Sequence, residues 1–542
     1  MRERIRRGTA RGLAWLCLAV PGLARPTLSI AQAPRPIPDA MPYTLTFTPK
    51  AFPGQPPLPA MQNYVMAGSK GKWLLVGGRV QGLHTFQTPP ARNFPPSSAN
   101  RSLVVIDPVL GKFWSLPLAG FPASIADPLG STGLQGCHDP AEDMFYVAGG
   151  YGLDSTSKAM VTFPSLIRIP LGPTIATITS GLSDAEKVQK LCPTFAATTD
   201  PGLAVTGGGL RKVQDRLYLA FGQNFKGDYY AFGSGAFTQV YTEAIRVINI
   251  ASSPLKVLAS ADITSGDPSH PYHRRDGSLV DVIDPDTGRP RFLALGGVFR
   301  PGSTLGYGQP IAIDDNQGMP TVAVSTSVDQ QFSQYECPVV PVYASAARSM
   351  YLTSFGGLSS NYHAQTAMQK TIYDLVVGQN RSDGMPFIAD VSTLALMAGG
   401  KSAQFIHLGP IAMTPIPPAV IELNFHKLGG GSFEKYEVQQ TNLIGGGVDF
   451  WADPALVASG KMTANGVIQL DAFQAGESAV VGYVFGGIAA IFPYALVPNN
   501  GTYASNTLFA VTLTKTPSSA WPASAGKRAA VTSGPAGLSV KP

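Results

Sequence analysis

Residues 144–150 read Met-Phe-Tyr-Val-Ala-Gly-Gly, an apolar strand that ends in two glycines. The same pattern, preceded by another strand and a short polar turn, occurs six times along the chain. The last glycines of the six copies are residues 78, 150, 222, 297, 357 and 487, so the spacings are 72, 72, 75, 60 and 130 residues. A repeat of about 70 residues, with an insertion in its final interval, is the feature that decides the fold.

Each repeat contains two apolar strands joined by a tight turn. In the fourth copy the turn is Asp-Pro-Asp-Thr-Gly at residues 284–288, which is typical of a hairpin. Apolar strands bounded by turn residues predict a small antiparallel sheet in each repeat. One such sheet cannot bury both of its faces, so the repeats must stack, and radial stacking also limits exposed edges. A linear solenoid is the alternative, but it would need distinct end caps, and the sequence shows none.

The two ends of the repeat region predict a closed ring. Residues 507–514 have the pattern of a third strand in the last repeat, and no fourth strand follows them. Residues 43–48 form an isolated strand pattern near the N-terminus. We expect this N-terminal strand to complete the last blade and thereby to close the ring.

The repeat resembles the Kelch repeat, in which a strand ending in Gly-Gly is followed by an aromatic strand near a tryptophan. The first copy keeps this tryptophan as Trp114. The resemblance covers roughly residues 43–516 and implies an all-β fold, a six-bladed Kelch-type β-propeller. The repeat is longer than the usual Kelch period of about 50 residues, which predicts long loops between strands. A seventh, degenerate blade within residues 410–465 is the structural alternative.

The chain divides into three parts. Residues 1–33 have a signal-peptide pattern, because several arginines precede an apolar stretch of 11 residues, Leu13 to Leu23, and small residues follow it. That stretch is too short to span a bilayer as a helix. Residues 34–516 form the propeller, with an insertion at about 410–465 that we interpret as a long functional loop or a lid. Residues 517–542 are small, polar and rich in Pro and Gly, which predicts a disordered tail. The protein is therefore expected to be secreted or periplasmic.

The charge of the chain without its signal peptide indicates which partners to expect. Without residues 1–33 the chain has 34 basic and 33 acidic residues, so its basicity belongs to the signal peptide. We therefore expect no nucleic-acid partner, no anionic-membrane partner and no membrane span after signal removal.

Cys137, Cys192 and Cys337 remain after cleavage, and a disulfide between Cys137 and Cys192 with one free thiol is the expectation for an oxidising compartment.

The candidate binding residues come from loops that follow the glycine-ended strands, because these loops gather on one face of a propeller. The predicted binding residues are Arg79, His84, Asn224, Lys226, His270, His273, Arg274, Arg275, Arg300, Tyr362 and His363. The run at residues 270–276 is the densest. Its arginines could hold a carboxylate bidentately, or its Arg and Asp side chains could hold neighbouring blades together. Two histidines three residues apart could share a metal, but they have no nearby third ligand, so no metal and no cofactor is predicted.

Two families of propeller enzymes are the catalytic alternatives. Resemblance to galactose oxidase, a copper-radical oxidase, would imply a Tyr–Cys crosslink and two histidine ligands, but the adjacent His-His pair of that family is absent. Resemblance to a sialic-acid mutarotase would imply an acid/base pair and an arginine, for which Arg79, Arg274, Arg300 and Glu336 are candidates. The sequence contains no Gly-x-Ser-x-Gly or His-Glu-x-x-His motif of a hydrolase.

The function that the sequence favours is therefore non-catalytic binding. The stretch Gly-Gly-Arg-x-x-Gly-Leu-His that ends at His84, together with Phe-Ser-Gln-Tyr at residues 332–335, resembles secreted bacterial Kelch-type proteins. We expect an exported binding protein that recognises a carbohydrate or a protein partner through the loops of one propeller face. A sugar-modifying enzyme, mutarotase-like or less favourably a copper oxidase, is the alternative.

Overall fold

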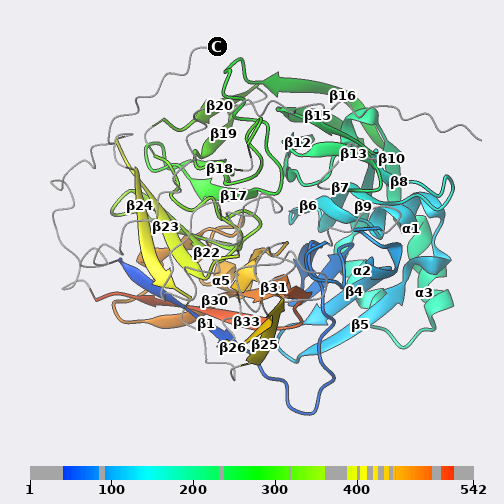
Figure 1. Ribbon diagram of the computed structural model, residues 1–542, viewed down its shortest axis with the longest axis horizontal. Helices are drawn as coiled ribbons and strands as arrows, with labels where there is room; N and C mark the ends of the chain where they lie inside the picture. The colour runs from blue at the N-terminus through cyan, green and yellow to red at the C-terminus, as the bar shows by residue number, and fades with distance from the viewer. Residues whose placement is uncertain are drawn as a thin grey trace, which may run out of the picture.

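The chain folds as a β-propeller, in which antiparallel sheets are arranged around a central axis (Figure 1). The computed structural model describes residues 41–84, 92–230, 237–303, 305–316, 319–326, 328–359, 387–399, 403–411, 419–424, 433–438, 443–445, 447–490 and 502–517. The predicted signal peptide and residues 518–542 of the predicted tail lie outside these ranges. None of the helices in the described part of the chain is long and apolar enough to cross a bilayer.

Five of the sheets have the regular form of a propeller blade, with four or five strands. The first repeat gives β2 (Val65–Ser69), β3 (Lys72–Val76), β4 (Ser102–Asp107) and β5 (Lys112–Pro117). The third gives β11 (Gly209–Val213), β12 (Arg216–Ala220), β15 (Ala244–Ser252) and β16 (Leu255–Thr264). The fourth gives β17 (Ser278–Ile283), β18 (Pro290–Leu295), β19 (Ile311–Asn316) and β20 (Met319–Val324). The fifth gives β21 (Val339–Ala344), β22 (Ser349–Phe355), β23 (Asp390–Met397) and β24 (Ala403–Pro410), with β29 (Ile468–Gln469) beside β21. The last gives β28 (Phe450–Ala452), β30 (Ser478–Phe485), β33 (Leu508–Lys515) and β1 (Tyr43–Pro49).

The second repeat lies in a wider sheet of seven strands, so the structure has five regular blades where the sequence predicted six. Its own strands are β6 (Thr132–Asp139), β7 (Met144–Leu153), β9 (Ser165–Pro170) and β10 (Ala196–Thr199). The additional strands are β8 (Met160–Thr162), β13 (Gln223–Gly227) and β14 (Phe237–Tyr241). The sheet widens because β7 is long enough to pair with β9 through its first half and with β8 through its end.

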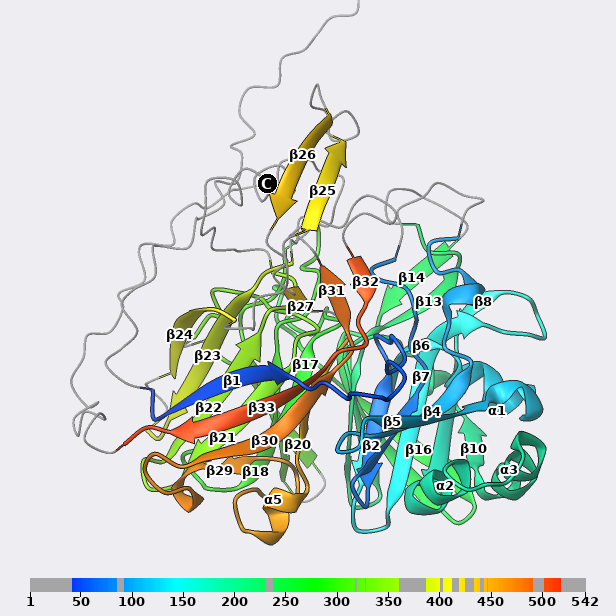
Figure 2. The same ribbon diagram turned by 90° about the horizontal axis from the view of Figure 1, so that it is seen from below.

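Short elements surround the blades. The helices are α1 (Ala123–Leu129), α2 (Leu171–Ile178), α3 (Asp184–Leu191) and α5 (Ala455–Ala458), with 3-10 turns η1 (Pro96–Ser98), η2 (Leu118–Gly120), η3 (Cys192–Thr194), η4 (Pro201–Leu203) and η6 (Leu470–Ala472). The described part of residues 410–465 includes β25 (Ala419–Asn424) and β26 (Phe433–Val438), a hairpin that projects from one face of the disc (Figure 2). It also includes β27 (Leu443–Gly445), which joins β31 (Ile488–Ala490) and β32 (Thr502–Ala504) in a small sheet.

The N-terminal strand closes the ring, as the sequence predicts. β1 pairs antiparallel with β33 from Tyr43 opposite Lys515 to Pro49 opposite Phe509. Tyr43 and Phe47 are buried, whereas Thr46 is exposed, which is the alternation expected of a strand with one face on the core. The Phe47 ring lies 4.1 Å from that of Phe355, so β1 also packs against the neighbouring blade.

The glycine pairs have a structural reason that the repeat pattern alone does not reveal. Gly149 and Gly150 both adopt positive φ, at +64° and +91°, a conformation that costs glycine little. The Gly150 N–H donates to the carbonyl of Val205 in the next repeat at 2.9 Å. A Cβ on Gly149 would lie 2.0 Å from that same carbonyl oxygen. The pair is therefore glycine because the neighbouring backbone approaches too closely for a side chain.

The same bond recurs between other repeats. The corresponding N–H groups of Gly78, Gly222 and Gly487 donate to the carbonyls of Ser131, Arg274 and Met61, each at 2.8 Å. Together with Val205 there are four such acceptors, and the second residue after each of them has positive φ. These residues are Gly133 after Ser131, Gly207 after Val205, Asp276 after Arg274 and Asn63 after Met61.

These residues belong to a second set of bonds around the axis, which we call the axial ring. Its members are Asn63, Gly133, Gly207, Asp276, Glu336 and Gly447, all with positive φ. Hydrogen bonds link Gly207 N–H to Gly133 O at 3.0 Å, Asp276 N–H to Gly207 O at 2.7 Å, Glu336 N–H to Asp276 O at 3.0 Å and Asn63 N–H to Gly447 O at 2.9 Å. Backbone bonds thus join successive repeats close to the axis.

The predicted disulfide between Cys137 and Cys192 is wrong, because all three described cysteines are free. Cys137 is buried with Leu166 and Leu217 in the core between the second and third repeats. Cys192 follows α3 and packs against a different cluster that includes Leu191. The two thiols therefore belong to separate parts of the core.

We expect Gly149→Ala to destabilise the protein far more than Gly302→Ala. Gly302 also has positive φ, +66°, but a Cβ there meets nothing within 4 Å, so that change should cost only about 1–2 kcal/mol. At Gly149 the clash with Val205 is added, and the loss should exceed about 3 kcal/mol. Urea unfolding of both variants measures the difference, and equal losses would show that the close approach of the blades is not constraining.

Candidate functional site

Arg79, the first predicted binding residue, is buried and holds its own loop together. Its backbone pairs with Gln62 and Ala99. Its guanidinium donates to the Pro95 carbonyl at 2.8 Å and to Gln81 Oε1 at 3.1 Å, and lies 5.1 Å from the centre of the Phe94 ring. Burial lowers its pKa to about 10. Arg79 therefore positions the loop that carries Phe94 rather than facing a ligand.

His84 belongs to an aromatic cluster over the seven-stranded sheet. Its ring lies 4.7 Å from that of Tyr229 and 5.1 Å from that of Phe94. Tyr229 follows β13, the strand that contains Asn224, which is partly buried, and Lys226, which is exposed. The widened sheet thus brings loops of the first and third repeats together.

The run at residues 270–276 is organised by a residue that the sequence did not single out, Glu243. One carboxylate oxygen of Glu243 lies 2.9 Å from His270 Nδ1, and the other lies 2.5 Å from His273 Nδ1. The His273 ring stacks on Tyr241 at 3.7 Å with an angle of 19° between the planes. Burial acts to raise the pKa of Glu243, but the hydrogen bonds from His273 and His270 outweigh it and lower that pKa.

This arrangement does not favour a shared metal at the two histidines. Both Nδ1 atoms are already directed at the Glu243 carboxylate. Within the described ranges, no group of three or more His, Cys, Asp and Glu side chains has the spacing to hold a metal ion.

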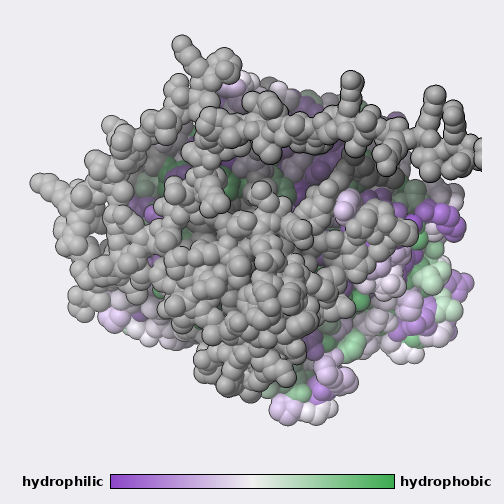
Figure 3. All heavy atoms as spheres, viewed as in Figure 1, coloured by the Kyte–Doolittle hydropathy of each residue, from purple (hydrophilic) through white to green (hydrophobic). Residues whose placement is uncertain are grey.

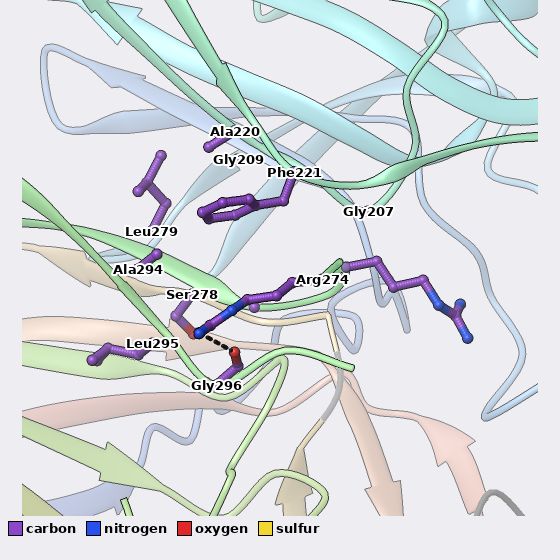
Figure 4. Close-up of a pocket in the computed structure, with 13 residues that line it drawn as sticks. Gly207, Gly209, Ala220, Phe221, Arg274, Ser278, Leu279, Ala294, Leu295 and Gly296 are labelled. Carbon is purple, nitrogen blue, oxygen red and sulfur yellow. Dashed lines mark hydrogen bonds between the residues drawn. The ribbon is translucent and has the colours of Figure 1, made fainter. Parts of the chain in front are cut away.

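Arg274 has a structural role, as the alternative interpretation of the run predicted. It is 2% exposed and donates to the carbonyls of Pro271, Gly296 and Gln309 at 2.6, 3.0 and 2.8 Å. Figure 4 shows its bond to Gly296 across the seam between the third and fourth repeats, opposite Phe221 and Leu279. Burial lowers the pKa of Arg274 to about 9. All three guanidinium nitrogens donate to backbone carbonyls, so the side chain holds two blades together.

Arg275 is largely buried and contacts groups from several elements. Its Nε donates to the Tyr241 hydroxyl at 3.1 Å, its Nη1 lies 3.3 Å from Asp276 Oδ2, and its guanidinium lies 5.2 Å from the centre of the Phe299 ring. Burial opposes its charge, but Tyr241 and Asp276 outweigh burial and raise its pKa. Arg300, by contrast, is exposed and lies 5.7 Å from the centre of the Tyr307 ring.

A pair of carboxyl groups occupies the axial ring beside Arg275. Asp276 and Glu336 hydrogen-bond to each other through their side chains. Burial raises the pKa of Asp276, although Arg275 opposes this. Burial and the neighbouring charge of Asp276 raise the pKa of Glu336 well above its ordinary value. The pair therefore holds a proton that a solvated glutamate would release.

Four of the nine described candidates, His84, His270, His273 and Arg275, belong to two groups of contacts, which together we call the loop cluster. Its members are His84, Phe94, Tyr229, Tyr241, Glu243, His270, His273 and Arg275. His84, Phe94 and Tyr229 form one group, and Tyr241, Glu243, His270, His273 and Arg275 form the other. Tyr362 and His363 lie outside the described residues.

The residues that sequence reasoning missed are Phe94, Tyr229, Tyr241 and Glu243. A structural signal marks the region, because Glu243, His270, Asp276 and Glu336 all have positive φ between +49° and +56°. Non-glycine residues in this conformation are strained and concentrate at functional sites. Nothing in the residue types alone reveals that strain.

The surface around α1–α3 shows no comparable feature. In the space-filling view this described area mixes hydrophilic and hydrophobic residues and has no single extended apolar patch (Figure 3). The candidate site therefore remains the loop cluster.

Comparisons with known proteins add little to this geometry. No family model matches the chain, and no curated protein matches it. Among solved structures the chain is similar to that of YjhT, with 11% identity, 83% of this chain and 99% of that chain covered, and a TM-score of 0.38. The assignment to the propeller fold rests on the strand pairing described above.

We expect Glu336→Gln to change how stability depends on pH. The pKa of Glu336 in the folded protein lies above its ordinary value of 4.5, so the folded state binds this proton more tightly than the unfolded chain. The contribution of Glu336 to the free energy of unfolding is therefore fully present at low pH and is lost as pH rises from about 4.5 through the raised pKa. Glutamine removes this loss and can still donate to Asp276. Relative to wild type, the variant should gain about 1–3 °C in Tm between pH 5 and pH 8.

Exposed Glu142 provides the control. Glu142→Gln should leave the difference in Tm from wild type the same at both pH values. An equal effect of Glu336→Gln at pH 5 and pH 8 would contradict the raised pKa.

Proposed function

We propose that this chain is an exported Kelch-type β-propeller that binds a carbohydrate or a protein partner through the loop cluster. The left-handed glycine pairs that end the second strand of most repeats support the Kelch assignment. The arginines and the short apolar stretch at the N-terminus support export.

The observation that carries the proposal is the set of aromatic rings and charged groups in the loop cluster. It combines aromatic rings with imidazole, carboxylate and guanidinium groups from loops of different repeats. Aromatic faces with a few fixed polar groups are the combination that binding sites use to orient a ligand. Loops on a rigid scaffold are also where binding residues concentrate.

The alternative is a sugar-modifying enzyme of the mutarotase kind. The observation in its favour is the proton-holding pair Asp276 and Glu336 beside Arg275. Ring opening of a sugar needs a group that delivers a proton and a group that accepts one. The copper-oxidase alternative is less favoured, because Glu243 engages both His270 and His273 and because Cys137 and Cys337 are buried thiols.

We expect the mature protein to retain a ligand on a glycan array or in a pull-down, and His270→Ala to weaken that binding by about tenfold. His270 suits the test because its side chain is 51% exposed, so its loss should leave the fold intact. Lys112→Ala on β5, the outer strand of the first blade, is the matched control and should bind as wild type does.

Two results would change the proposal. Equal binding by His270→Ala and wild type would place the ligand elsewhere. Catalysed interconversion of sugar anomers, followed by NMR and lost in Glu336→Gln, would make the enzyme the better account.

A further inference from the structure

The loop of residues 265–277 is fastened to the third blade by one group of side chains, which we call the clamp. The clamp consists of Glu243, His270, His273 and Tyr241. The two Glu243 oxygens lie 2.9 and 2.5 Å from the two imidazole Nδ1 atoms. Tyr241 stacks on His273 and accepts a hydrogen bond from Arg275, so the clamp also positions the buried end of the loop.

The clamp holds strained backbone in place. Glu243 and His270 both have φ of +49°, a conformation that non-glycine residues rarely adopt. Such conformations persist only where surrounding contacts enforce them. The hydrogen bonds between Glu243 and the histidines are contacts of this kind, so weakening them would loosen the part of the loop around His270 and His273.

Several titratable and charged groups face the two histidines. From the same loop these are Asp267, Arg274 and Arg275. From neighbouring elements they are Glu243 and Tyr241, and Tyr307, whose hydroxyl donates to the His270 carbonyl at 2.8 Å and whose surroundings include Arg300. Glu243 is the carboxylate in direct contact with both rings.

Protonation of the histidines strengthens the clamp. Histidine is the side chain whose charge ordinarily changes between pH 5 and 8. A neutral imidazole donates a hydrogen bond to the Glu243 carboxylate, and protonation of the imidazole adds the attraction between opposite charges to that bond. The lowered pKa of Glu243 keeps its carboxylate ionised over this range.

We propose that the clamp is a pH-responsive device that orders the loop of residues 265–277 as the medium becomes acidic. Because Arg275 and the stacked His273 are held by this loop, the loop cluster becomes more rigid at acidic pH. The consequence for ligand affinity rests on the proposed function, whereas the ordering of the loop does not.

Hydrogen exchange of the unliganded mature protein tests the proposal. After correction for intrinsic rates, amides of residues 265–277 should exchange about three- to tenfold more slowly at pH 5.5 than at pH 7.5. The hairpin at residues 284–289, which contains no histidine, serves as the internal control and should show the same corrected protection at both pH values.

Variants assign the effect to the clamp. Glu243→Gln keeps the shape but removes the charge, so the pH dependence should disappear. Glu142→Gln, an exposed glutamate elsewhere, should retain it. If Glu243→Gln does not fold, His270→Gln removes one of the two bonds and should reduce the ratio.

Protection that is independent of pH in the wild type would overturn the proposal. A pH dependence that is retained in Glu243→Gln, or that is not reduced in His270→Gln, would also overturn it. The test is separate from that of the proposed function. If exchange of the loop depends on pH but no ligand is found, the clamp is supported and the proposed binding function is contradicted. If a ligand binds but exchange does not depend on pH, the binding function is supported and the clamp is contradicted.

Discussion

The close approach of each blade to the next is the constraint on which the structure depends. An N–H group at the end of a glycine pair donates to the backbone of the following repeat, as Gly150 does to Val205 at 2.9 Å. This bond requires left-handed φ and leaves no room for a Cβ on the preceding residue. The glycines therefore recur in the sequence because the contacts between blades require them, and not because the strands that end in them do.

The third repeat departs from this rule, and the loop cluster lies beside the departure. Phe221 stands where other repeats have the first glycine, and it keeps the left-handed φ of +62°. A cavity of about 10 Å³ lies at the same seam, lined by Phe221, Arg274 and Gly207, enough for about one water molecule. Three members of the axial ring are not glycine, namely Asn63, Asp276 and Glu336, and the last two lie beside Arg275 of the loop cluster. Local rules of a fold are most often broken at functional sites, which agrees with the position of the candidate site.

The sequence predicted the parts of the fold that depend on regular spacing. The spacing of the glycines predicted the repeat, and the isolated strand pattern at residues 43–48 predicted that β1 closes the ring. The seven-stranded sheet could not be predicted, because β8 is three residues long and its partner β13 is far from it along the chain. The predicted disulfide was wrong because the spacing of cysteines along the chain does not reveal that Cys137 and Cys192 pack in different hydrophobic clusters.

The sequence named some residues of the loop cluster but not the contacts that they make. The run at residues 270–276 was recognised as dense in functional residue types, yet Arg274 fastens two blades and Glu243 organises the histidines. Such roles depend on which side chains meet across repeats, and residue type does not specify that. Arg79 shows the same limit, since its burial against Phe94 depends on a loop fifteen residues away.

The closed ring is the central claim, and a disulfide across its closure tests it most directly. Thr46 on β1 lies opposite Thr512 on β33, and antiparallel strand neighbours fall within the Cα separation that a disulfide spans. The measurement is Tm under oxidising and reducing conditions for Thr46→Cys with Thr512→Cys, on a Cys192→Ser background. The account predicts an intramolecular crosslink and a higher Tm in the oxidised form. A pair that stays reduced, or that crosslinks only between molecules, would contradict closure of the ring by β1.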